Sequence, residues 1–94
     1  MIGKVKVIHM KTILCYGDSN TYGYRPDGKG RFSKEERWTG ILSERLKKEN
    51  TEIIEEGLVG RTTVFEDSIR PGRKGIDYLY PLLESHAPVD KYII

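Results

Sequence analysis

The first feature of this sequence that could do chemistry is a serine that closes an apolar run. Residues 13–16 read Ile-Leu-Cys-Tyr, and Gly17, Asp18 and Ser19 follow at once. A hydroxyl nucleophile needs a sharp turn that raises it above a sheet, with backbone N–H groups near it to bind an oxyanion. A turn from a buried strand into a helix offers both, because the first N–H groups of a helix have no intrahelical partner. The tripeptide fits equally an ordinary turn in which Ser19 is the helix N-cap.

The elements that must position this turn alternate between strand and helix patterns. The continuous apolar run at 13–16 is typical of a strand buried on both faces. A second strand is predicted over 51–56, and residues 92–94 begin a third. Connections of this length suit parallel strands with right-handed crossovers. The sequence therefore predicts an α/β fold on a parallel sheet.

Two helices are predicted, one after each of the first two strands. The apolar face of the first is formed by Trp38, Ile41, Leu42 and Leu46, with Asn50 as the end signal. The apolar face of the second is formed by Ile76, Leu79, Tyr80 and Leu83. Pro81 lies inside the second helix and removes a backbone donor, so we expect a break or kink there. The segments 24–37 and 57–75 are rich in Gly, Pro and charge and are predicted to be loops.

Composition excludes several classes of protein. The 94 residues suffice for one small domain. The net charge is +2, and basic residues alternate with acidic ones, which indicates a solvated surface and no nucleic-acid partner. No apolar run is long enough to span a membrane, and lysines interrupt residues 1–9 too often for a signal peptide, so we expect a cytoplasmic protein. The single cysteine, Cys15, allows no intrachain disulfide and is expected to be a buried thiol.

Three separated segments resemble the SGNH (GDSL) hydrolases. Residues 13–23 resemble the first sequence block of that family. Residues 37–40 (Arg-Trp-Thr-Gly) and 55–63 (Glu-Glu-Gly-Leu-Val-Gly-Arg-Thr-Thr) resemble its aryl-esterase and acyltransferase branch. The resemblance runs from about residue 11 to residue 94. It implies a flavodoxin-like, three-layer fold with strand order 2-1-3-4-5, and a lipolytic or arylesterase-like serine ester hydrolase that needs no cofactor.

The resemblance also implies roles for individual residues. Ser19 matches the family nucleophile, and its N–H would be one oxyanion donor. Gly60 matches the glycine whose N–H is the second donor, although from the residues alone it is an ordinary loop glycine. Asp18 matches an aspartate that supports the turn. The implied substrate is a small acyl ester, and hydrolysis and acyl transfer both remain open.

Other catalytic blocks of the family are absent from these 94 residues. Members supply a third oxyanion donor from a Gly-x-Asn-Asp block, and the base and its partner from an Asp-x-x-His block. We therefore expect residues 10–94 to be the N-terminal half of an SGNH domain, truncated after the third strand and inactive alone. His86, four residues before Asp90, is expected to interact with helix C-terminal carbonyls and not to replace the base. His9 lies in residues 1–9, which are interpreted as an N-terminal extension, with a first strand or a flexible arm as alternatives.

The third strand would form an unpaired edge, and such edges seek partners. We expect association with a second copy or with a chain that carries the C-terminal half. A non-catalytic flavodoxin-like half-domain that acts by association is the alternative function, and a phosphate-binding turn at residues 17–19 is a third. No cluster of His, Cys, Asp and Glu has metal-ligand spacing, so no metal is expected.

Overall fold

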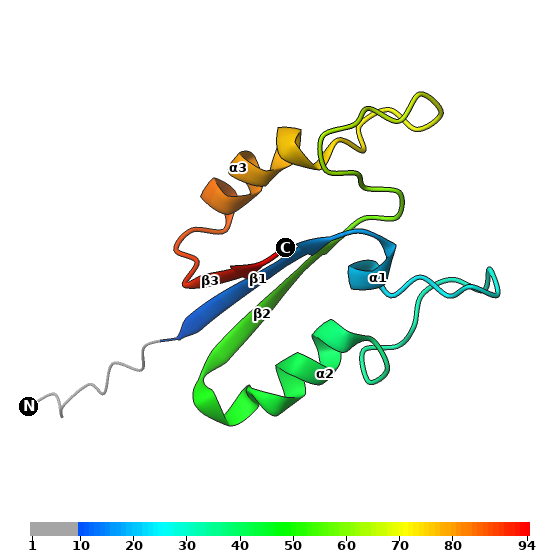
Figure 1. Cartoon of the computed structure of the whole chain (residues 1–94). Helices are drawn as coiled ribbons and strands as arrows, with labels where there is room; N and C mark the ends of the chain where they lie inside the picture. Colours follow the sequence, from blue (N-terminus) through cyan, green and yellow to red (C-terminus); the bar gives the residue numbers. More distant parts are fainter. Residues whose placement is uncertain (1–9) are drawn as a thin grey trace, which may run out of the picture.

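Three strands form one parallel sheet in the computed structural model, which describes residues 10–94. The interpretation of residues 1–9 as an extension lies outside the described residues. The strands are β1 (Lys11–Gly17), β2 (Thr51–Gly57) and β3 (Lys91–Ile93), in the order β2-β1-β3 (Figure 1). The predicted α/β fold is confirmed, and this order is the one expected for the first three strands.

Strand β1 is the centre of the sheet. It pairs with β2 along its whole length, from Lys11 opposite Thr51 to Gly17 opposite Gly57. Strand β3 pairs with only three of its residues, 13–15. Because β1 has neighbours on both sides and helices on both faces, its side chains form the core: Leu14 and Cys15 are fully buried. This position explains the continuous apolar run and confirms the expected burial of the thiol.

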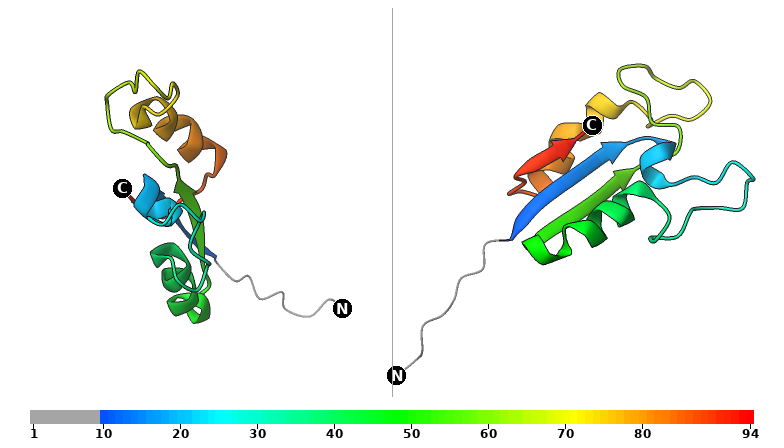
Figure 2. Two further views of the ribbon diagram at one scale, coloured as in Figure 1. Left: turned by 90° about the vertical axis from the view of Figure 1, so that its right-hand side faces the viewer. Right: turned by 60° about the horizontal axis from the view of Figure 1, so that its bottom comes forward.

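The helices cover opposite faces of the sheet. In the chain, helix α2 (Trp38–Arg45) follows β1 and helix α3 (Gly75–Ser85) follows β2. Figure 2 shows the two helices on opposite sides of the sheet. The chain moves from β1 to β2 on one side and then to β3 on the other side of β1. Two crossovers of the same hand therefore place their helices on opposite faces, which gives the three expected layers.

The first helical segment packs differently from its sequence pattern. Helix α2 ends at Arg45, a 3₁₀ turn (η1, Lys47–Glu49) follows, and Asn50 in the left-handed region ends the segment as predicted. The buried residues of α2 are Thr39 and Gly40, whereas Trp38 and Ile41 of the predicted apolar face are exposed. The Thr39 hydroxyl donates to a carboxylate on β2, whereas Gly40 packs against the preceding loop, since a Cβ on it would lie 1.8 Å from the carbonyl oxygen of Lys34.

We expected a break or a kink at Pro81, and the break is wrong. Helix α3 continues through this proline to Ser85. Pro81 lies on the exposed side, so the carbonyl four residues earlier, which loses its N–H partner, can bind water. Ile76 and Tyr80 are also wrongly placed on the packing face, since they are 44% and 67% exposed.

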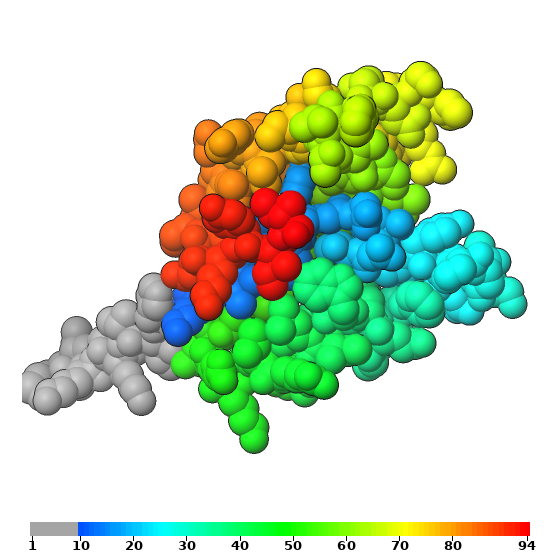
Figure 3. All heavy atoms as spheres, viewed as in Figure 1, coloured from blue at the N-terminus to red at the C-terminus, as the bar shows by residue number. Residues whose placement is uncertain are grey.

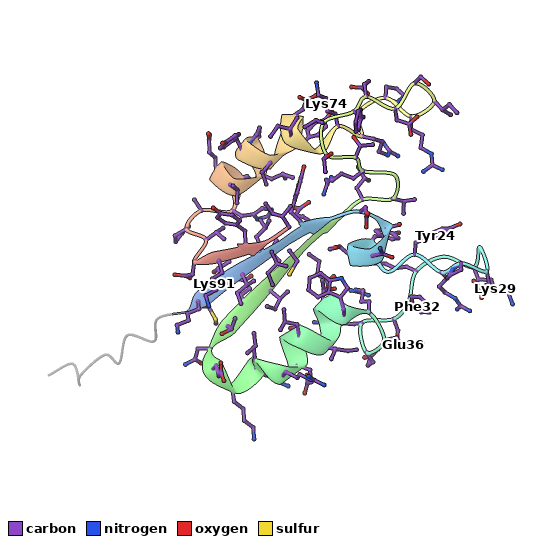
Figure 4. The ribbon with its side chains drawn as sticks, viewed as in Figure 1. Tyr24, Lys29, Phe32, Glu36, Lys74 and Lys91 are labelled. Atoms are coloured by element: carbon purple, nitrogen blue, oxygen red, sulfur yellow. The ribbon has the colours of Figure 1, made fainter. Side chains whose placement is uncertain are left out.

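The loops carry exposed polar side chains, as predicted. Lys29 lies at the tip of the 24–37 loop, away from the sheet (Figure 4). Within residues 10–94, no helix is long and apolar enough to cross a membrane.

Candidate active site

Ser19 is the first residue of the short helix α1 (Ser19–Tyr22), which follows the C-terminal end of β1. Strands β2 and β3 lie on opposite sides of β1. The direction of the connections therefore reverses about β1: the first runs from β1 to β2, and the second runs from β2 back across β1 to β3. In open α/β sheets such a switch point, at the carboxyl ends of the strands, is where ligands bind. The fold thus places Ser19 where a site is expected.

Asp18 is the N-cap of α1. Its Oδ1 accepts a hydrogen bond from the N–H of Asn20 at 3.0 Å, and its carbonyl accepts one from the N–H of Tyr22 at 3.0 Å. The alternative in which Ser19 itself is the cap is therefore wrong. Among residues 10–94, neither the hydroxyl nor the N–H of Ser19 makes a hydrogen bond, so both are free to meet a ligand.

Gly17 permits the sharp turn between β1 and α1. A Cβ added to this residue would lie 2.1 Å from Oγ1 of Thr21, which is buried one helical turn later. A side chain at position 17 would therefore push α1 away from the strand. This close approach confirms the tight backbone expected from Gly17.

Gly60 lies three residues after the end of β2. The N–H of Leu58 donates to the carbonyl of Gly17 at 3.1 Å, which joins the two segments after β1 and β2. Gly60 has a φ of 81°, a conformation that residues with a side chain rarely adopt. Its N–H donates no hydrogen bond within residues 10–94. The ends of two adjacent strands thus each carry a free backbone donor, on Ser19 and on Gly60.

Arg61 links the ends of these two strands, a role that sequence analysis missed. Its Nη1 donates to the carbonyls of Gly17 at 3.2 Å and Glu56 at 2.6 Å. Its guanidinium lies 4.0 Å from the ring centroid of Tyr16, whose hydroxyl donates to the carbonyl of Gly75 at 2.6 Å. Burial raises the pKa of Tyr16, although the charge of Arg61 acts in the opposite direction. Only the position of Arg61 next to Gly60 could have pointed to it.

A second cluster lies on the opposite face of the sheet, around Glu55 of β2. Its carboxylate accepts hydrogen bonds from Arg37 at 2.8 Å and from the Thr39 hydroxyl at 2.9 Å, and pairs with Arg31 at 3.2 Å. Burial by itself would raise the pKa of Glu55, but these hydrogen bonds and charges outweigh it and lower the pKa. Arg31 also donates to the carbonyl of Tyr22 at 2.6 Å, so this cluster ties the end of α1 to β2.

His86 is not brought to Ser19. Its Nε2 lies 3.0 Å from Oε1 of Glu56, so the predicted interaction of this side chain with helix carbonyls is wrong. Asp90 instead accepts a hydrogen bond from the N–H of Thr12 at 2.7 Å. Within residues 10–94, no histidine is hydrogen-bonded to Ser19, and no group of His, Cys, Asp and Glu could hold a metal ion.

Comparison with solved structures identifies the fold. The aryl esterase of M. smegmatis is 44% identical with a TM-score of 0.83, over 89% of this chain and 40% of that chain. A carbohydrate acetylesterase family member from Sinorhizobium meliloti is 44% identical with a TM-score of 0.81, over 88% of this chain and 39% of that chain. AlinE4, an SGNH-hydrolase family esterase, has the same fold at 22% identity, with a TM-score of 0.63 over 94% of this chain and 42% of that chain. The chain is similar to the N-terminal part of the SGNH hydrolases.

This SGNH-like chain spans about two fifths of the length of the structures it matches. No protein-family model and no curated protein matches it.

A hollow of about 470 Å³ lies beside the turn, where the SGNH-like sheet is open next to β3. The residues that line it come from β1, both helical layers, the loop after β2 and the last two residues: Tyr16, Gly17, Asp18, Thr21, Trp38, Arg61, Thr62, Thr63, Val64, Gly75, Ile76, Leu79, Ile93 and Ile94. Figure 3 shows the C-terminal residues at the surface between the two layers. Ser19 and Gly60 do not line this hollow, so it adjoins the candidate site and is not the site itself.

Proposed function

We propose that this chain supplies the nucleophile and two oxyanion donors of an SGNH-type serine ester hydrolase that acts on small acyl esters. The observation that carries the proposal is the position of Ser19 at the switch point, with a free hydroxyl and a free N–H while Asp18 caps the helix. The 44% identity to an aryl esterase supports ester chemistry.

In the proposed reaction, the Ser19 hydroxyl attacks the ester carbonyl while a base takes its proton. The N–H groups of Ser19 and Gly60 stabilise the negative charge that develops on the carbonyl oxygen. The protonated base then gives its proton to the leaving alcohol, which leaves an acyl group on Ser19. Water, or a second alcohol, attacks this acyl-enzyme and releases the product. No cofactor takes part.

The base in this scheme has to come from outside residues 10–94. His86 is the one histidine within them, and it is paired with Glu56. In a well-studied serine protease, removal of the catalytic His alone lowers kcat by roughly 10⁶-fold. Removal of one oxyanion donor lowers it by roughly 10²–10³-fold. We therefore propose that the 94 residues alone have no turnover that depends on Ser19.

Hydrolysis of p-nitrophenyl acetate by the purified 94-residue chain tests this proposal. The expected rate is close to the rate without protein and is unchanged by Ser19→Ala. Ser85→Ala, which removes an exposed hydroxyl at the end of α3, is the matched control. Turnover that disappears in Ser19→Ala and persists in Ser85→Ala would show that these residues hold a complete catalytic site.

A second candidate function is association without catalysis. The edge strand β3 and the residue after it are apolar and exposed: Tyr92 by 60%, Ile93 by 43% and Ile94 by 73%. An open strand edge next to a hollow favours pairing with a second copy or with a chain that carries a C-terminal half. Sedimentation velocity is expected to show a dimer that Ile93→Lys weakens. A stable monomer at all concentrations would contradict self-association.

A further inference from the structure

We propose that Arg61 is a positioning residue that sets where the N–H groups of Ser19 and Gly60 stand relative to each other. This inference rests on the proposed function, because it concerns the two donors proposed there. Its evidence is the set of contacts that Arg61 makes behind the candidate site.

One carbonyl joins the two segments. The oxygen of Gly17 accepts hydrogen bonds from the N–H of Leu58 at 3.1 Å and from Nη1 of Arg61 at 3.2 Å. Gly17 lies two residues before Ser19, and Leu58 lies two residues before Gly60. Each proposed donor therefore lies two residues along the backbone from the hydrogen bond at the Gly17 oxygen, so this bond restrains both segments.

The side chain of Arg61 also binds a second carbonyl at this junction. The same Nη1 donates to the carbonyl of Glu56 at 2.6 Å, so it holds the ends of β1 and β2 together. The guanidinium lies over the ring of Tyr16, which is only 5% exposed and is itself fixed by its hydrogen bond to Gly75. The stacked ring defines the plane of the guanidinium and hence the direction of its N–H groups.

The chemistry requires an arginine in this place. The buried Nε of Arg61 has no hydrogen-bond partner within residues 10–94. A buried polar atom without a partner destabilises a fold. The orientation of the guanidinium that leaves Nε unpaired is the one that brings Nη1 to the carbonyls of Gly17 and Glu56. A lysine keeps the charge but has no planar group to stack on Tyr16. Arg61→Lys should therefore loosen the junction while the charge is kept.

The test uses NMR on the ¹⁵N-labelled 94-residue chain. In Arg61→Lys we expect the amide resonances of Ser19 and Gly60 to shift. We also expect hydrogen exchange of the Leu58 N–H, which is bonded to the junction, to become at least about tenfold faster. Exchange in the middle of the sheet, at Leu14, should change by less than about threefold. The mid-sheet readout separates a local positioning role from a general loss of stability.

The matched control is Arg25→Lys, because within residues 10–94 the guanidinium of Arg25 pairs with the exposed Asp27 and lies over the ring of Phe32, and it has no hydrogen bond to the junction. It should leave the resonances of Ser19 and Gly60 in place. Unmoved resonances in a folded Arg61→Lys protein, or faster exchange by the same factor throughout the sheet, would overturn the proposal.

A second variant covers the case in which Arg61→Lys does not fold. Arg61→Gln keeps one amide donor and removes the charge, and a folded Arg61→Gln protein is judged by the same amides. If neither variant folds, Arg61 serves global stability and the proposal fails. The readout is geometry and not turnover, so a Ser19 that proves unreactive would sink the proposed function while leaving this result standing.

Discussion

At the end of β1, the carboxylate of Asp18 accepts the helix-capping hydrogen bond that a serine in the same turn could have accepted. Ser19 is thereby left with a free hydroxyl at the first position of α1. The order of these two residues matters, because an N-cap serine would hold its oxygen against the backbone of its own helix.

The cap can be tested by removing the carboxylate. Asp18→Ala should lower the free energy of unfolding by about 1 kcal/mol, because the N–H of Asn20 loses its acceptor. Asp18→Asn keeps an oxygen in the same place and is the matched control, with a change of a few tenths of a kcal/mol expected. Urea unfolding of the three proteins measures both values. Equal losses in both variants would show that the cap bond does not support the turn.

The Glu55 cluster predicts a pH dependence. The pKa of Glu55 is lowered in the folded chain, so its contribution to stability is complete above the ordinary carboxyl pKa of about 4.3 and is lost as the pH falls through the lower, folded pKa. At pH 7, Glu55→Gln should lower the free energy of unfolding by about 1.5–3 kcal/mol, since the charged hydrogen bonds to Arg37 are lost.

Urea unfolding between pH 7 and pH 3 measures this contribution. The difference between the original chain and Glu55→Gln should shrink as the pH falls below about 4.3. Glu52→Gln, an exposed position on the same strand, is the control and should show no such trend. A difference that stays constant across this range would contradict the assigned role of the carboxylate.

Some of the residues around the candidate site can be predicted from the sequence, and others cannot. The resemblance predicts roles for Ser19, Gly60 and Asp18, and their segments follow adjacent strand ends in the structure. The roles of Arg61 and Glu55 could not be predicted, because they depend on which strands are neighbours. A sequence pattern shows that a residue follows or lies in a strand, but not which carbonyl or side chain of another strand it meets.

At the level of elements, the three strands and both loops follow from the sequence, because apolar runs and Gly/Pro clusters reflect local physics. The helix faces were predicted less well. In α2 the buried residues are Thr39 and Gly40, and a small buried residue carries no hydrophobic signal. In α3 the effect of Pro81 depends on whether solvent can reach the freed carbonyl, which the sequence does not reveal.

The continuity of α3 can be tested at this proline. Pro81→Ala restores an N–H donor to the carbonyl of Asp77 and should stabilise the chain, by at most about 3 kcal/mol. The position is exposed, so the alanine loses little packing. Thermal unfolding followed by circular dichroism measures the change. A lower melting temperature would show that the proline is favoured by a contact that Ala cannot make.

At the level of the whole molecule, the order β2-β1-β3 places β1 between two neighbours. The turn that carries Ser19 therefore lies at the end of the central strand, next to the connection that leaves β2, whose Leu58 N–H bonds to the Gly17 carbonyl. The chain spans about two fifths of the length of the esterase structures that it matches.

The most direct measurement is covalent labelling of Ser19 by a fluorophosphonate probe. It uses a fusion of residues 10–94 to the part of the M. smegmatis aryl esterase that this chain does not match, with folding checked by circular dichroism. We predict a single adduct, mapped by mass spectrometry to Ser19, which disappears in Ser19→Ala and persists in Ser85→Ala. A folded fusion that remains unlabelled, or that is labelled equally in Ser19→Ala, would contradict the assignment of Ser19 as the nucleophile.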